Sequence, residues 1–236
     1  MRILKVLTLI IGLSLLTVAY GAGEEAVKSK TQPNPTEPIS VTKIMPLGDS
    51  ITLGVQSSYL NGYRRPLALL LEKYKVDFVG SVHWAGNPDF DGDNEGHGGW
   101  EAGQIRDNVY NWLVANPADI VLLHIGTNNI VHNQKAEDII IEIAQIIDEI
   151  YRYNSDVVII LAQIINWADA GRIQYQETSK LNSLINNLSN KAYVVNMESA
   201  LNYPDDFSDM LHPNDSGYKK MAEVWFSAMN VIYFKK

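Results

Sequence analysis

The sequence predicts an α/β fold, a three-layer α/β/α sandwich around a central, mostly parallel five-stranded sheet. Two observations predict it. Apolar runs of strand length alternate with helical segments along the chain, and strands separated by helices connect through right-handed crossovers into a parallel sheet. Residues 119–125 are almost continuously apolar, as expected of a parallel strand that is covered on both faces. The 236-residue chain is long enough to bury such a core.

The predicted elements follow one another in a regular order. The strands are short apolar runs at residues 41–47, 76–82, 119–125, 157–165 and 192–197. The helices between and after them are expected at residues 66–75, 104–114, 136–153, 175–190 and 214–234. The helix at 136–153 has the clearest pattern, because its isoleucines recur at helical spacing and form one apolar stripe. Residues 81–101 are polar and rich in glycine, and we expect them to form a long loop.

The first 21 residues have the pattern of a secretory signal peptide. Arg2 and Lys5 precede an uncharged, mostly apolar run at 6–20, and small residues surround the expected cleavage point after Gly21. An uncleaved membrane anchor is the alternative, but the run is short for a span of about 20 residues. We therefore expect a secreted or periplasmic protein that has no stable membrane association once the signal peptide is removed.

Composition limits the remaining possibilities. Residues 22–40 contain three prolines among polar residues and predict a linker, so that residues 41–236 form one domain. The chain has 19 basic and 27 acidic residues, a net charge of −8, which argues against nucleic acid as a partner. It has no cysteine, which excludes disulfides, thiolate metal sites and a cysteine nucleophile.

Polar residues with catalytic chemistry follow the predicted strands at the edge where such sheets bind ligands. Ser50 follows the first strand, Asn128 follows the third, and Asp209 and His212 precede the last helix. A serine hydroxyl is a weak nucleophile that needs a general base, usually a histidine oriented by a carboxylate. Each residue alone also fits a helix cap or a turn. Their combination at one edge predicts a serine nucleophile, its base, an acid and an oxyanion donor.

The spacing of the acid and the base supports this assignment. Asp209 and His212 are three residues apart, so they can meet across one turn, where the carboxylate fixes the orientation of the imidazole. Asp205 and Asp206 are alternative acids close by. The serine motif is not the Gly-x-Ser-x-Gly elbow of another hydrolase class, because Thr52 stands where the second glycine belongs.

The chain resembles the GDSL esterases of the SGNH hydrolase superfamily, whose sheet is flavodoxin-like. The resemblance is carried by Gly48-Asp49-Ser50-Ile51-Thr52, Gly126-Thr127-Asn128 and Asp209-Met210-Leu211-His212. It implies that Ser50, His212 and Asp209 are catalytic. It also implies an oxyanion hole made by Ser50, Asn128 and a glycine of the polar loop, for which we take Gly99, with Gly98 as the alternative. Asn129 departs from the aspartate that is common in the family, at a position that is not catalytic.

A narrower resemblance is to carbohydrate esterase family three, whose members are mostly acetyl xylan esterases. It rests on Met45-Pro46-Leu47, Gly62-Tyr63-Arg64, His97-Gly98-Gly99-Trp100 and His212-Pro213-Asn214-Asp215. It implies that the enzyme deacetylates xylan or a related polysaccharide. A lysophospholipase or short-chain lipase with the same machinery is the main alternative, and a non-catalytic carbohydrate-binding relative is another.

Aromatic and acidic residues near the same edge offer further candidates. Trp84, Trp100 and Trp167 are candidate sugar-stacking walls, although local packing accounts for each of them equally well. Residues 89–95 have the composition of a calcium loop, but Asn94 replaces the required glycine, and a solvated acidic loop is favoured. The histidines lack metal-ligand spacing. We expect no metal and no cofactor, and an acetylated polysaccharide or another small ester as the partner.

Overall fold

The computed structural model describes residues 41–83, 89–167 and 172–235. The predicted signal peptide and linker, together with Trp84, lie outside these ranges. The strands are β1 (Thr42–Gly48), β2 (Val76–Phe78), β3 (Val82–His83), β4 (Asp93–Gly96), β5 (Ile120–His124), β6 (Val158–Ala162) and β7 (Tyr193–Val195). The α-helices are α1 (Ser50–Leu53), α2 (Arg64–Leu70), α3 (Ala102–Ala115), α4 (Thr127–Val131), α5 (Ala136–Tyr153), α6 (Ile173–Asn186) and α7 (Asp215–Met229).

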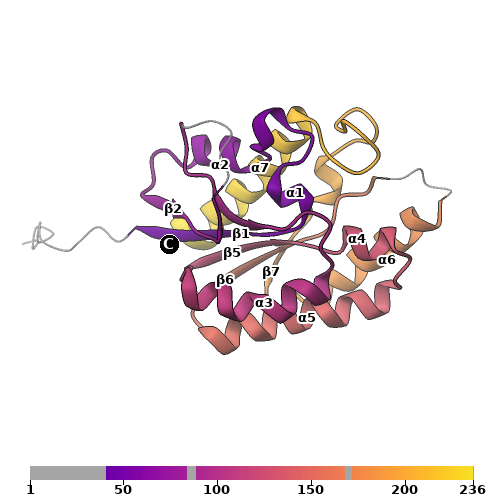
Figure 1. Ribbon diagram of the computed structural model, residues 1–236, viewed down its shortest axis with the longest axis horizontal. Coiled ribbons are helices and arrows are strands. Elements are labelled where there is room, and N and C mark those ends of the chain that lie inside the picture. The colour runs from indigo at the N-terminus through magenta and orange to yellow at the C-terminus, as the bar shows by residue number, and fades with distance from the viewer. Residues whose placement is uncertain (1–40, 84–88, 168–171, 236) are drawn as a thin grey trace, which may run out of the picture. The chain divides into compact units, whose positions relative to one another are not determined.

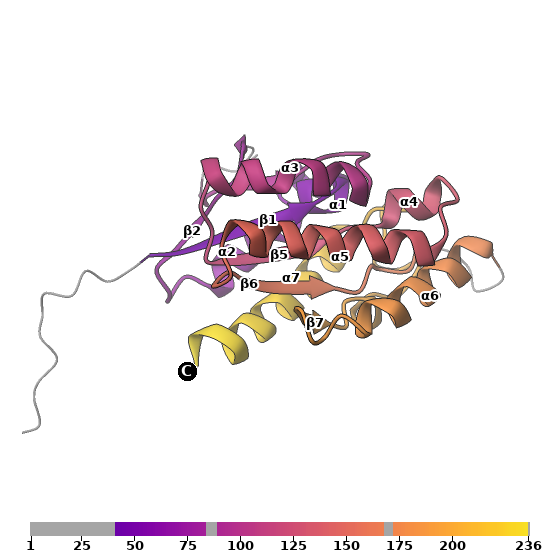
Figure 2. The same cartoon turned by 90° about the horizontal axis from the view of Figure 1, so that it is seen from below.

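The strands form one sheet in the order β3-β4-β1-β5-β6-β7, and β2 also pairs with β1. Every pairing is parallel except that of β3 with β4. Helices α3, α5 and α6 cover one face of the sheet, and α1, α2 and α7 cover the other (Figures 1 and 2). The α/β/α class is therefore confirmed.

The sheet has seven strands among the described residues, two more than the five predicted. The additional strands, β3 and β4, lie in the segment that was expected to be a loop. Strand β4 has no apolar pattern, because it is held by the buried polar side chains of Asn94 and Glu95. The Asn94 amide donates to the carbonyls of Val82 and Gly92. These hydrogen bonds hold the strand without the apolar side chains by which a buried strand is predicted.

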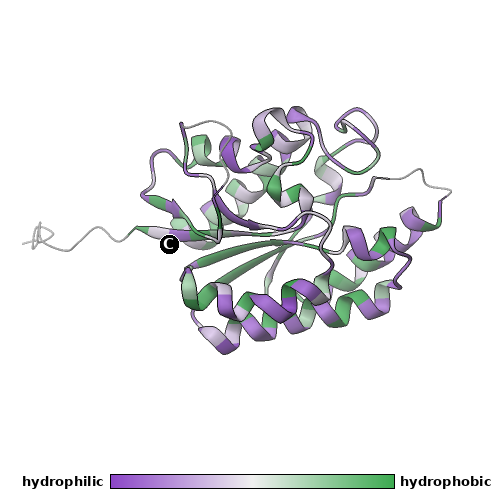
Figure 3. Ribbon diagram, in the orientation of Figure 1, coloured by the Kyte–Doolittle hydropathy of each residue, from purple (hydrophilic) through white to green (hydrophobic). Residues whose placement is uncertain are grey.

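The core lies between the sheet and its two helical layers. Strand β5 is buried along its whole length, and the buried positions of α5 include Ile139, Ile143, Ile146 and Ile150, as the isoleucine pattern predicts. Figure 3 shows the same arrangement, with apolar strands inside and helices that are polar on their outer faces. None of the helices in the described ranges is long and apolar enough to cross a bilayer.

Because β1, β5, β6 and β7 run in parallel, their carboxyl ends meet at a single edge of the sheet. Helix α1 begins directly after β1 and α4 directly after β5, on the right in Figure 1. This edge therefore carries Ser50 and Asn128, each on a short helix that follows a strand.

Candidate active site

Ser50 is the first residue of α1, in a sharp connection from strand to helix. Asp49 caps this helix, and its Oδ1 accepts a hydrogen bond from the N–H of Ile51 at 2.9 Å. At Gly48 a Cβ atom would lie 2.1 Å from the carbonyl oxygen of His124 on β5, so only glycine fits there. The short helix ends at Gly54, whose φ of +92° suits glycine. The backbone around Ser50 is thus fixed on both sides.

Asp49 also has a second, unpaired oxygen. Its Oδ2 is buried and has no hydrogen-bond partner among the described residues. Burial raises the pKa of Asp49 from 3.8 to about 7, despite hydrogen bonds from backbone N–H groups that lower it. Below about pH 7 the neutral carboxyl group is therefore favoured in the folded protein. In the unfolded chain the same carboxyl group ionises near its ordinary pKa of 3.8.

This raised pKa predicts a pH-dependent stability. Because the folded state binds the proton more tightly, the stabilisation is complete below about pH 3.8 and is lost as the pH rises through about 7. Asp49→Asn keeps an oxygen acceptor for Ile51 and does not titrate. We expect the unfolding free energy of the wild type, relative to this variant, to fall by up to about 4 kcal/mol between pH 4 and pH 8. Urea unfolding of both proteins measures it, and a constant difference would contradict the assignment.

His212 lies between Ser50 and Asp209. Its Nε2 is 3.0 Å from Ser50 Oγ, and its Nδ1 is 2.9 Å from Asp209 Oδ2. Asp209 Oδ1 also accepts the backbone N–H groups of Leu211 and His212, at 2.8 and 2.7 Å. Asp206, one of the alternative acids, instead bonds to Lys220 and therefore belongs to a different contact. The structure brings together the three residues that the sequence predicted as nucleophile, base and acid.

The charge of Asp209 follows from its surroundings. Partial burial raises its pKa, but hydrogen bonds from the Leu211 backbone and from His212 outweigh burial, and the net pKa lies below its ordinary value. An ionised carboxylate only accepts hydrogen bonds, so the Nδ1–H of His212 must donate to it. The Nε2 of the neutral ring then faces Ser50 with its lone pair. This is the tautomer that can take a proton from the serine hydroxyl.

The two predicted glycines belong to a turn that reaches Ser50. The turn at residues 97–100 is closed by a hydrogen bond from the Trp100 N–H to the His97 carbonyl, at 3.1 Å. Gly99 has a φ of +81°, the value that a type II turn requires at its third residue. A Cβ atom at Gly98 would lie 3.9 Å from Ser50 Cβ, so the turn reaches the nucleophile.

The side-chain amide of Asn128 is anchored to this turn. Its Nδ2 donates to the carbonyl of Trp100 at 2.9 Å. A side-chain amide carries two N–H groups, so one remains for an oxyanion. The structure therefore places Asn128, Gly98 and Gly99 in one cluster with Ser50. Which of the two glycines donates its N–H remains an assignment from the family resemblance.

Two of the three predicted tryptophans lie within the described residues. Trp84 is outside the described residues. Trp100 is half-buried and stacks on His97, with ring centroids 4.5 Å apart. Trp167 is only 7% exposed and packs in the core. The structure thus gives Trp100 and Trp167 packing partners, and their role as sugar-stacking walls stays a prediction.

The acidic segment 89–95 uses its carboxylates in separate contacts. Asp89 pairs with Arg65, Asp91 accepts from the Phe78 N–H, and Asp93 pairs with His83. Across the three described ranges, no three His, Asp or Glu side chains are grouped so that they could hold a metal ion. A metal-independent reaction is still an expectation, which an assay after dialysis against EDTA addresses.

Contacts between distant segments hold the nucleophile and the base together, and sequence reasoning missed them. Both carboxylate oxygens of Asp215, at the start of α7, accept from Ser58, one from its N–H at 2.8 Å and one from its hydroxyl at 2.6 Å. The Tyr218 hydroxyl donates to the Val55 carbonyl at 2.7 Å. These bonds join the segment that follows Ser50 to the segment that follows His212. Each bond joins residues more than 150 positions apart in the sequence, so no local sequence pattern predicts it.

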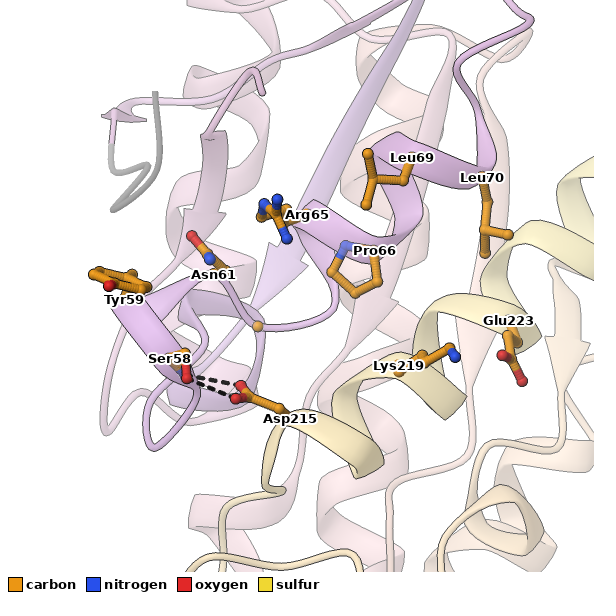
Figure 4. A pocket seen from close by; sticks show the side chains of 11 residues that line it. Ser58, Tyr59, Asn61, Arg65, Pro66, Leu69, Leu70, Asp215, Lys219 and Glu223 are labelled. Carbon is orange, nitrogen blue, oxygen red and sulfur yellow. Dashed lines mark hydrogen bonds between the residues drawn. The ribbon is translucent and has the colours of Figure 1, made fainter. Parts of the chain in front are cut away.

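Figure 4 shows a pocket beside the Ser58–Asp215 contact, between α2 and α7. Its volume is about 530 Å³, and its lining includes Tyr59, Pro66 and Leu69. None of the predicted catalytic or oxyanion residues lines it. The hydrogen-bond geometry, rather than the size of this pocket, therefore locates the chemistry at Ser50.

A serine, a histidine and an aspartate joined by hydrogen bonds at the carboxyl edge of a parallel α/β sheet define a serine hydrolase. Residues 47–220 match the model of the GDSL-like Lipase/Acylhydrolase family, and the chain belongs to that family. Membership places it among the carboxylic ester hydrolases.

Two similar solved structures are named as family 3 carbohydrate esterases, and one curated relative is named as an esterase. A family 3 carbohydrate esterase from Clostridium thermocellum is 31% identical with a TM-score of 0.72, over 82% of this chain and 97% of that one. A carbohydrate esterase family 3 structure from Talaromyces cellulolyticus is 25% identical with a TM-score of 0.70, over 83% and 100%. A multidomain esterase from Ruminococcus flavefaciens is 27% identical over 215 residues, 78% of this chain. The chain spans only 28% and 55% of the lengths of two curated relatives that it matches.

Proposed function

We propose that this enzyme hydrolyses short-chain esters, acetyl esters above all, and removes acetyl groups from xylan or a related polysaccharide. The observation that carries the proposal is the position of His212 Nε2, 3.0 Å from Ser50 Oγ, with Asp209 on the far side of the ring. This geometry supports a Ser-His-Asp acyl-enzyme mechanism.

In that mechanism, Ser50 Oγ attacks the ester carbonyl carbon while His212 takes the hydroxyl proton. The carbonyl oxygen becomes an oxyanion that accepts hydrogen bonds from the Ser50 N–H, the Gly99 N–H and the Asn128 amide. The first N–H groups of a helix lack intrahelical partners, and within the described ranges the Ser50 N–H makes no hydrogen bond, which leaves it available for this role. His212 then protonates the leaving alcohol. Water attacks the acyl-enzyme by the same steps and releases the acid.

Two observations support a polysaccharide substrate: the similar solved structures and the proposed signal peptide. The similar structures from Clostridium thermocellum and Talaromyces cellulolyticus are named as family 3 carbohydrate esterases. A polymer of this kind has to be met outside the cytoplasm, which agrees with the proposed signal peptide at residues 1–21 and a secreted or periplasmic location. Cell fractionation with an antibody against the mature chain tests the location.

The acyl specificity is tested by chain length. Residues 89–101, which include the turn beside Ser50, are polar and glycine-rich and form no lid helix before α3 begins at Ala102. A pocket for a fatty tail would add up to about 0.8 kcal/mol, or about fourfold, for each methylene buried. We therefore expect kcat/KM to fall steeply from p-nitrophenyl acetate to the butyrate and to be negligible for the octanoate. Values that are flat or rise along this series would favour the lysophospholipase or lipase alternative.

Release of acetate from acetylated xylan, compared with other acetylated polysaccharides, then tests which polymer is the substrate.

A further inference from the structure

We propose that His97 is a positioning residue that holds the two remote oxyanion donors, the Gly99 N–H and the Asn128 amide, in place. This inference rests on the proposed function, in which both groups stabilise the tetrahedral intermediate. Among the described residues, the hydrogen bonds and ring contacts of the His97 side chain are to Glu95, Trp100 and Trp112 rather than to Ser50, His212 or Asp209, so it acts through the turn at residues 97–100.

The imidazole of His97 packs in a cluster of three rings and is hydrogen-bonded at one edge. It stacks on the indole rings of Trp100 and Trp112, with ring centroids 4.5 Å away in each case and interplanar angles of 27° and 7°, and the two indoles also contact each other with centroids 5.7 Å apart. Its Nε2 is 2.8 Å from Oε2 of Glu95. The two ring contacts and the hydrogen bond restrain the orientation of the ring, and the side chain is only 17% exposed.

Glu95 anchors this ring to the sheet. Its side chain is completely buried, and its two oxygens also accept from the N–H and the hydroxyl of Ser81, at 2.6 and 2.9 Å. A carboxylate has no proton to give when ionised, so the bond to His97 requires an N–H on Nε2. Glu95 lies on β4 in register with Leu47 of β1, three residues before Ser50. The anchor is therefore fixed relative to the nucleophile.

Trp100 connects the ring of His97 to both donors. Its N–H closes the turn on the His97 carbonyl, and its own carbonyl accepts the hydrogen bond from Asn128 Nδ2. Gly98 and Gly99 have no side chains with which to hold the turn, and glycine has the widest conformational freedom. A shift of the His97 ring would therefore move Trp100, and with it both the Gly99 peptide and the Asn128 amide.

The test compares two substitutions at His97 with one matched control. His97→Phe keeps an aromatic ring against the tryptophans but removes the N–H to Glu95. His97→Gln can keep the N–H and loses the ring. We expect His97→Phe to lower kcat on p-nitrophenyl acetate about 10–100-fold with KM within about twofold, the cost of a small misplacement of catalytic groups. His97→Gln should retain more activity.

His83→Phe is the control, because it removes another histidine–carboxylate pair, His83 Nδ1 with Asp93 at 2.8 Å, from the antiparallel strands β3 and β4, the second of which carries Glu95. It should leave kcat unchanged. Circular dichroism and urea unfolding establish that each variant folds, and His97→Gln takes over all comparisons if the Phe variant does not. A rise in KM with kcat unchanged in the His97 variants would contradict a positioning role. So would a loss of kcat in His83→Phe as large as that in His97→Phe.

The decisive comparison adds Asn128→Ala. If His97 acts by holding the oxyanion donors, its substitution costs less once one of those donors is gone. We expect the double variant to be about threefold or more faster than the product of the two single losses predicts. Strictly multiplicative losses, in a wild type that hydrolyses the ester, would overturn only the role of His97. A wild type that neither hydrolyses esters nor reacts with a fluorophosphonate would overturn the proposed function and this inference with it.

Discussion

Ser50→Ala is expected to lower kcat for ester hydrolysis by about 10⁴–10⁶-fold, the range found when a serine nucleophile is removed. Its hydroxyl is the atom that His212 Nε2 faces at 3.0 Å, and no other group of the site can form the acyl-enzyme. The fold should survive, because the cap of α1 is Asp49 rather than Ser50 and alanine is a good helix former. Initial rates with p-nitrophenyl acetate measure the loss, and urea unfolding measures the stability.

Ser227→Ala provides the matched control. Ser227 lies on α7 with an exposed side chain, so the same substitution there should change neither kcat nor KM. An Ser50→Ala variant with full activity would show that the hydrolysis uses another nucleophile. A folded wild type without activity on any ester would instead favour the non-catalytic carbohydrate-binding relative.

Asn128→Ala is expected to lower kcat by about 10²–10³-fold with little change in KM, the cost of losing one oxyanion donor. The amide is held at the Trp100 carbonyl before any substrate arrives, so its second N–H is already oriented when the negative charge develops. Interactions that form only in the transition state change kcat and leave ground-state binding alone. Steady-state kinetics on p-nitrophenyl acetate separate the two constants.

Asn129→Ala makes the contrast. Asn129 is buried, accepts from the Ala102 N–H and donates to Gln134 and Glu142, so its loss should reduce the free energy of unfolding by about 1–3 kcal/mol. The folded Asn129→Ala protein should keep kcat far above that of Asn128→Ala. An Asn128→Ala effect that falls mainly on KM would assign Asn128 to substrate binding instead.

The parts of the fold that could be predicted are those with a periodic apolar signal. Helix α5 spans the predicted residues 136–153 and buries its isoleucine stripe, and β5 is buried throughout, as its continuous apolar run predicts. The edge that carries Ser50 and Asn128 was also predictable, since parallel strands bring their carboxyl ends together. In the helix and the strand the apolar pattern lies within one short segment of the sequence, because a whole face of that segment is buried.

What could not be predicted depends on polar contacts between distant segments. Strand β4 is stabilised by the hydrogen bonds of Asn94 and Glu95, which look like loop residues in the sequence. The bond between Ser58 and Asp215 joins positions 157 residues apart. His97 is part of a family motif in the sequence, but its stacking on Trp100 and Trp112 requires α3 to be placed first. No single-sequence pattern encodes these contacts, because they exist only once the sheet has formed.

The most direct measurement of the central claim is covalent labelling with a fluorophosphonate, followed by mass spectrometry of the digested protein. The phosphorus atom reacts with an activated serine hydroxyl and then mimics the tetrahedral intermediate. The account predicts a single adduct on Ser50 in the wild type and none in Ser50→Ala. The labelling rate should be much slower in His212→Ala, because the base that activates the hydroxyl is gone. An adduct on a different serine, or equal labelling of Ser50 without His212, would contradict the Ser50–His212–Asp209 assignment.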